Sequence, residues 1–167
     1  EEKGLLGSNF YAANPIIPAS KTVASINMDA LYVDGRSKDV TVYGLGHSQL
    51  DDYLADAVQK QGRVISGDPQ PEAGIYYRSD HVSFANIGIP ALYAKSGRVP
   101  VDEATKALRE QLKSNLDKCV HNTCDEYSEH WDLSGAIEDM QAFFDIGYEL
   151  SKRDVWPQWN KASEFKR

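Results

Sequence analysis

Apolar positions along this chain switch between the two-residue spacing of strands and the three- and four-residue spacing of helices. Residues 39–43 read Asp-Val-Thr-Val-Tyr and stand before a glycine, which predicts a strand. An apolar bias within residues 21–31, at 64–65 and through 91–93 predicts three further strands. Residues 1–13 contain two glycines, so this segment predicts a loop that leads into a weak helix.

Three longer segments have helical periodicity. Ser48 stands where a helix cap belongs and predicts a helix that starts after it. Residues 102–117 predict a second helix, and residues 133–152 predict the clearest one. We expect the tail from 155 to 167, with its two tryptophans, to pack on the surface. The apolar positions of the last helix are Leu133, Ala136, Ile137, Met140, Phe143, Phe144, Gly147 and Leu150.

Strands that alternate with helices predict an α/β protein built on a layered sheet, in which sites form where loops leave the strand ends. A length of 167 residues is enough for one domain with its own core, and 41% hydrophobic residues argue against disorder. The sequence begins with Glu and has no targeting segment, so we expect it to be a piece of a longer precursor.

Charge and hydropathy narrow the possible partners. The formal net charge is −7 and no basic cluster occurs, which argues against nucleic acid as a partner. The apolar runs are far shorter than a bilayer requires, so we expect no membrane span.

The two cysteines, Cys119 and Cys124, flank the short sequence Val-His-Asn-Thr. A turn of this kind can close a small disulfide loop, which predicts an oxidising compartment such as the periplasm or the exterior. Two free thiols, or a cramped zinc site with His121, are the alternatives. Packing of this loop is the favoured role of His121, with a place near the site as the alternative. His47 and His130 are assigned to the surface or to capping.

Ligand types that suit zinc occur at three places along the chain. His81 stands on a predicted polar turn ahead of the apolar run 89–94. Asp29 follows a predicted strand, and the chain opens with Glu1 and Glu2. One imidazole with several carboxylates is a ligand set that zinc accepts.

The order of these motifs resembles the co-catalytic zinc aminopeptidases, and the nearest likeness is to bacterial exported leucyl-type members. Glutamate carboxypeptidase is a more distant member of the same group. The resemblance covers essentially the whole chain. The segments that support it are residues 1–8, 27–29, 78–84 with 88–91, 121–127 and 156–159.

The resemblance implies a mixed sheet flanked by helices and two zinc ions that share a bridging water. It implies that Glu1 is the general base, that Glu2 and His81 bind one zinc, and that Asp29 binds the other. A free carboxylate next to a metal-bound one makes chemical sense, because one can move the proton while the other holds the metal.

Two further roles are predicted near His81. Asp80 is a candidate for orienting the histidine or its turn. Tyr77, or its neighbour Tyr76, is a candidate hydrogen-bond donor to the oxyanion of the reaction.

The family also needs a His-x-Asp motif and a bridging Asp ahead of the Glu-Glu pair, and this sequence starts at that pair. We therefore expect residues 1–167 to be the C-terminal part of a single catalytic domain, truncated on its N-terminal side. Alone it is expected to be inactive and to bind zinc weakly or not at all, because catalytic zinc takes three protein ligands.

Three functions follow as hypotheses. The first is a zinc exopeptidase that hydrolyses the N-terminal bond of peptides. The second is a catalytically dead module of the same fold, which binds partners or self-associates through a truncated sheet edge. The third is another metal-dependent amidohydrolase with the same ligands, such as a carboxypeptidase or a cyclase.

Overall fold

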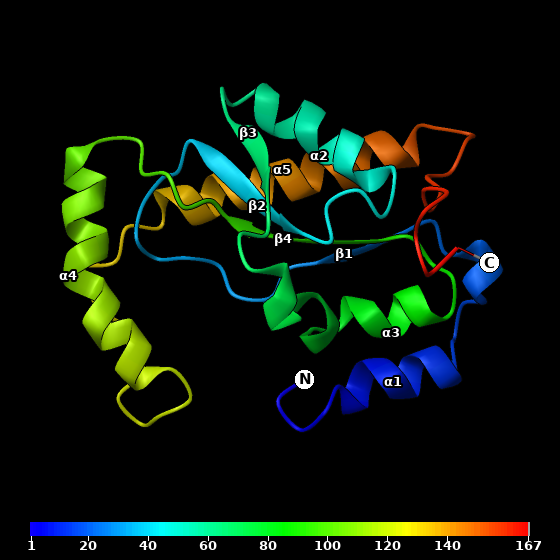
Figure 1. The fold of residues 1–167 in the computed structure, drawn as a ribbon, viewed down its shortest axis with the longest axis horizontal. Helices are drawn as coiled ribbons and strands as arrows, with labels where there is room; N and C mark the ends of the chain where they lie inside the picture. The colour runs from blue at the N-terminus through cyan, green and yellow to red at the C-terminus, as the bar shows by residue number, and fades with distance from the viewer. Residues whose placement is uncertain (167) are drawn as a thin grey trace.

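The computed structural model describes residues 1–166, except for the side chain of Leu116. Four strands and five α-helices make up the fold, with short 3-10 turns at Ala19–Lys21, Pro71–Ala73 and Ile75–Arg78 (Figure 1). The strands are β1 (Ser25–Asn27), β2 (Asp39–Tyr43), β3 (Val64–Gly67) and β4 (Ala91–Ser96). The helices are α1 (Leu6–Ala13), α2 (Leu50–Gln59), α3 (His81–Asn86), α4 (Glu103–Cys119) and α5 (Ser134–Ser151).

The sheet has the order β1-β4-β2-β3 and mixes both directions. β1 runs parallel to β4, and β2 runs parallel to β3, whereas β2 and β4 are antiparallel. The prediction of an α/β protein with a mixed sheet between helices is therefore confirmed. The strand predicted at residues 39–43 has those bounds in the structure.

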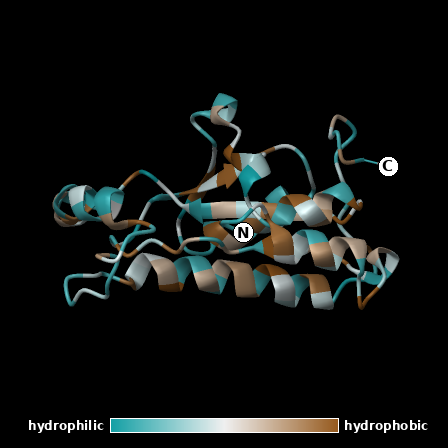
Figure 2. Ribbon diagram, turned by 90° about the horizontal axis from the view of Figure 1, so that it is seen from below, coloured by the Kyte–Doolittle hydropathy of each residue, from teal (hydrophilic) through white to brown (hydrophobic). Residues whose placement is uncertain are grey.

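The alternation of side chains along the strands divides the core between the two faces of the sheet. Val40 and Val42 join the aliphatic cluster that α2 and α5 cover. Tyr43 and Tyr93 point to the opposite face, where they stack at 4.8 Å and meet the residues of α3. In Figure 2 the strands at the centre are largely brown, whereas much of α4, at the left end, is teal.

The predicted apolar positions of α5 divide between two faces of the helix. The inner one, which includes Phe143, Ile146 and Leu150, packs on the sheet. The outer one is exposed, and we call it the outer row of α5. Its members are Ile137, Met140, Phe144 and Tyr148, together with Leu133 at the N-cap.

The sequence predicted that the C-terminal tail packs on the surface, but part of the tail is buried in the core. Trp159 is buried, its indole Nε1 donates to the carbonyl of Gly88 at 3.1 Å, and its ring packs against Phe165 at 5.2 Å. The sequence gives no sign of this contact, because it joins positions about seventy residues apart.

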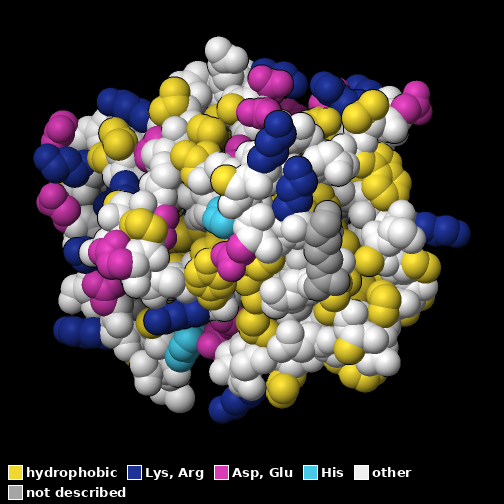
Figure 3. Space-filling view, turned by 45° about the vertical axis from the view of Figure 1, so that its right-hand side comes forward, with side chains coloured by type: hydrophobic (Ala, Val, Ile, Leu, Met, Phe, Trp, Pro, Cys, Tyr) yellow, Lys and Arg dark blue, Asp and Glu magenta, His cyan; other side chains and the backbone are white. Residues whose placement is uncertain are grey.

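Apolar side chains also lie on the surface beside α1. Leu6 and Phe10 are exposed, and Ile16 and Ile17 follow them in the next turn of chain. Figure 3 brings this side forward, and yellow side chains are more abundant toward its right. Within residues 1–166, no helix combines the length and the apolar character that a bilayer crossing requires.

Candidate functional site

Asp29 lies just beyond the end of β1, where its carboxylate meets a set of donors. Oδ2 accepts hydrogen bonds from Ser79 Oγ and from the Tyr93 hydroxyl, both at 2.9 Å. Lys95 Nζ stands 3.7 Å from the same oxygen. Partial burial works to raise the pKa of Asp29, but the hydrogen bonds and the lysine charge outweigh it, so the pKa is lowered. Asp29 is thus held ionised and oriented, as a metal-binding carboxylate needs to be.

The two glutamates at the start of the chain lie near Asp29. Partial desolvation, the hydrogen bond with Glu2 and the charges of Glu2 and Asp29 raise the pKa of Glu1. A carboxylate with a raised pKa is a better proton acceptor, which suits a general base. Both side chains face solvent, so they are open to a ligand.

Glu2 contacts His121, for which the sequence favoured loop packing over a place near the site. The Nε2 atom of His121 lies 2.9 Å from Glu2 Oε1. His121 belongs to the loop after α4, and this loop is closed by a disulfide between Cys119 and Cys124. The predicted disulfide is therefore confirmed, and a zinc site built from both thiols is excluded because the sulfurs bond to each other.

His81 stands in a different environment from the one predicted. It is the first residue of α3, not part of a polar turn, and its side chain is fully buried. The rings of Tyr76 and Tyr93 pack on it, with centroids at 4.5 and 4.7 Å. Neither ring nitrogen has a hydrogen-bond partner within residues 1–166. Burial lowers the pKa of His81 to about 4, although the charges of Asp29 and Asp80 oppose this.

Both predictions at His81 remain predictions. Asp80 directly precedes α3 and makes no side-chain cap hydrogen bond, and its role in orienting the histidine or its turn stays a prediction. A metal role for His81 stays a prediction. In the structure, however, its nitrogens do not meet Glu2, the residue with which it was expected to share a zinc.

The two tyrosines proposed for the oxyanion also differ. Tyr77 is exposed and its hydroxyl donates to Glu164 of the C-terminal tail, which raises its pKa. Tyr76 is buried and its hydroxyl has no partner in the described part of the chain. Burial raises the pKa of Tyr76 strongly, so its hydroxyl stays protonated and can donate. Tyr76 therefore fits a donor role better than Tyr77.

The donors fit zinc in chemical type but are not gathered into a complete site. Glu2 and His121 offer a carboxylate and an imidazole in contact, and Asp29 offers a second, ionised carboxylate. Among residues 1–166, no group of three or more His, Cys, Asp and Glu side chains is close enough to hold a metal ion.

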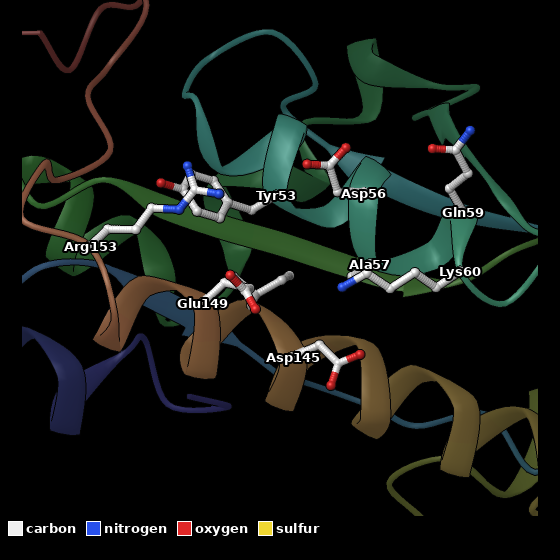
Figure 4. A pocket seen from close by; sticks show the side chains of 9 residues that line it. Tyr53, Asp56, Ala57, Gln59, Lys60, Asp145, Glu149 and Arg153 are labelled. Carbon is white, nitrogen blue, oxygen red and sulfur yellow. The ribbon is translucent and has the colours of Figure 1, made fainter.

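A cavity of about 500 Å³ lies elsewhere, between α2 and α5 (Figure 4). Its walls are mostly charged or polar, and the guanidinium of Arg153 stands 5.0 Å over the ring of Tyr53. The strands separate this cavity from Asp29, because α2 and α5 cover the face opposite to Tyr93. It is thus no part of the candidate site.

Comparison with known proteins places the chain among the metallopeptidases. Residues 1–144 match Peptidase family M28, and the chain belongs to that family, whose members are generally zinc-dependent. It is 30% identical over 142 residues to aminopeptidase Y of Saccharomyces cerevisiae, a match that covers 79% of this chain and 24% of that protein. The chain thus spans about a quarter of the length of this curated relative. No solved structure matches it.

Proposed function

We propose that the complete protein is a zinc-dependent aminopeptidase and that residues 1–167 supply the C-terminal part of its single catalytic domain. The observation that supports this most is the contact of Glu2 with His121 beside the solvent-facing carboxylate of Glu1. A metal-binding pair with an adjacent base is what hydrolysis by an activated water requires.

Each residue has a distinct role in this proposal. Glu2 and His121 would hold one zinc, and the ionised Asp29 would bind the other. A bound zinc pair supplies Lewis acidity, which lowers the pKa of a coordinated water. Glu1 would accept a proton from the attacking water and pass it to the leaving amine. Tyr76 is the candidate donor to the oxyanion, in place of Tyr77.

The remaining ligands come from outside residues 1–167, so this chain alone is expected to be inactive. The substrate class is peptides with a free N-terminal amine, since acidic groups near the metals attract an ammonium. The disulfide supports an oxidising location, the periplasm or the exterior. A likeness to the exported leucyl-type members remains part of the proposal.

A second candidate function is binding or self-association without catalysis. Two exposed apolar surfaces favour it: the outer row of α5 and the groove between β1 and α5. β1 is an edge strand, and such edges pair readily with another chain. Light scattering of the 167-residue chain over a concentration series tests this, because a concentration-dependent dimer is expected.

The proposed activity is tested on the natural full-length protein with the anilide of leucine and with its N-acetylated analogue. Hydrolysis of the free-amine substrate, loss of activity with 1,10-phenanthroline and recovery with added zinc are the expected results. Equal cleavage of the acetylated analogue would point instead to another amidohydrolase. Activity that survives removal of all metal would refute the proposal.

A further inference from the structure

The elements on either side of the loop that carries His121 do little to fix its position. Of the described side chains of α4, only Leu112 and Cys119 are buried, so the helix before the loop packs weakly. After the loop, no helix or strand forms until α5 begins at Ser134. The position of His121 therefore depends mainly on contacts inside the loop itself.

His121 has a backbone conformation that L-residues rarely adopt. Its φ is +61°, in the left-handed region, and Leu5 is the other non-glycine residue in residues 1–166 with positive φ. Such a conformation persists only where the surroundings impose it, and it often marks a functional position.

Two elements impose this conformation. The disulfide closes the chain from Cys119 to Cys124, so the ends of the turn cannot separate. Asn122 adds two hydrogen bonds from its Nδ2, to the carbonyls of Lys118 at 3.0 Å and Val120 at 3.1 Å. With both in place, the imidazole of His121 reaches Glu2.

We propose that the Cys119–Cys124 disulfide is a redox-sensitive clamp, which positions His121 to bind metal together with Glu2. This inference rests on the proposed function, because it assumes that His121 is a zinc ligand. It adds that the metal site is assembled only while the disulfide is intact. In a reducing compartment the same protein would lose the site formed by His121 and Glu2 without losing its fold.

The chemistry of the switch is a two-electron reduction. A phosphine reductant attacks one sulfur, the S–S bond breaks, and water completes the reaction, which leaves two thiols and one phosphine oxide. Cys124 is exposed whereas Cys119 is buried, so the attack is expected at Cys124. Opening the ring frees His121 to leave the left-handed region.

The test uses the full-length protein and its serine variant C119S/C124S. Serine is preferred to reduction as the main test, because free thiolates would bind zinc themselves. Zinc affinity is measured by competition with a chromogenic chelator. Loss of a group that orients a ligand lowers metal affinity by about 10–100-fold, and this is the expected result for C119S/C124S.

Three further measurements separate the possible outcomes. Backbone hydrogen exchange in the zinc-free protein is expected to speed up at residues 120–123 in C119S/C124S, whereas α5 stays unchanged. N122A, which keeps the disulfide, is expected to weaken zinc binding less. H130A removes an exposed imidazole outside the loop and is expected to bind zinc as the unchanged protein does.

The inference and the proposed function fail in different ways. If C119S/C124S keeps zinc affinity within about twofold while H121A loses it, the clamp is refuted and the zinc site stands. If H121A itself keeps full zinc affinity, His121 is not a ligand, and both the clamp and the proposed zinc site are refuted. Should C119S/C124S fail to fold, titration of the unchanged protein with a phosphine, followed by the same exchange measurement, decides the question.

Discussion

The two faces of the sheet differ in how the buried polar side chains on them are hydrogen-bonded. On the face covered by α5, Arg63 Nη2 donates to Asp139 at 2.7 Å, to Ser37 at 3.2 Å and to the carbonyl of Asp39 at 3.1 Å. On the face of α3, both ring nitrogens of His81 and the hydroxyl of Tyr76 lack partners within the described residues. Leaving polar groups unpaired costs stability, and native proteins accept that cost mainly where chemistry needs it. Arg63 Nη2 thus keeps three acceptors although the Nε of Arg63 is unpaired, whereas His81 has no partner within residues 1–166; the proposed site lies on the second face.

The sharpest test of this contrast is the substitution Glu1→Gln in the full-length protein. A general base contributes about 10²–10⁴ to the rate, so kcat is expected to fall by that factor with KM little changed. Because Glu1 is exposed, the unfolding midpoint should stay the same. Lys3→Gln is the matched control and is expected to leave kcat unchanged. A drop in kcat of less than tenfold for Glu1→Gln would contradict its role as base.

On the stabilising face, Asp139→Ala is expected to cost about 3–5 kcal/mol, because it leaves the charge of Arg63 buried without its partner. Urea denaturation of the 167-residue chain measures this loss. Replacing both members, as R63M/D139L, should recover most of it. A cost below about 1 kcal/mol for Asp139→Ala would mean that this buried pair does not stabilise the fold as described.

On the face of α3, the buried and unpaired His81 is expected to make the stability of the chain depend on pH. Burial lowers the pKa of His81 from 6.5 to about 4, so between these values the unfolded chain binds a proton that the folded chain does not. Stability is therefore fully present above about pH 6.5 and is lost as the pH falls toward 4. The loss amounts to about 3 kcal/mol.

Urea midpoints at pH 7 and pH 4.5 measure this loss, with His81→Phe as the comparison. Phenylalanine keeps a flat ring beside Tyr76 and Tyr93 but cannot take up a proton. Its pH dependence should be flatter over this range than that of the unchanged chain. Parallel curves for the two proteins would show that His81 is not the group that titrates.

The smallest effect is expected on α5, where neighbouring phenylalanines have opposite environments. Phe144 is 65% exposed and Phe143 is 6% exposed. Phe144→Ala should change the stability of the 167-residue chain by no more than about 0.5 kcal/mol, whereas Phe143→Ala should cost about 3–5 kcal/mol. A large loss for Phe144→Ala would show that the outer row of α5 is covered in solution.

Local patterns in the sequence predicted the fold well. Residues 39–43 alternate valines with other side chains, and this pattern depends only on neighbouring residues, so the bounds of β2 were correct. The disulfide was predicted for the same reason, since its partners are five positions apart. The predicted apolar positions of α5 did not separate its buried face from the outer row, because helical spacing shows where apolar residues align, not which row packs against the sheet.

The site depends on contacts between distant positions, and here the sequence was less informative. The side chains of Glu2 and His121 meet only because α4 ends near the start of the chain. His81 stands between polar neighbours in the sequence, yet Tyr76 and Tyr93 enclose it in space. A signal for His121 did exist: a histidine inside a short disulfide loop is held more rigidly than one in an open turn.

The most direct test of the central claim, that His121 rather than His81 completes the metal site with Glu2, is the zinc content of two variants. His121→Ala and His81→Phe are made in the full-length protein and dialysed against buffered zinc, and zinc per chain is measured by elemental analysis. The account predicts that His121→Ala holds about one zinc fewer per chain than the unchanged protein, while His81→Phe holds as many as it does. Full zinc in His121→Ala together with a loss in His81→Phe would contradict it.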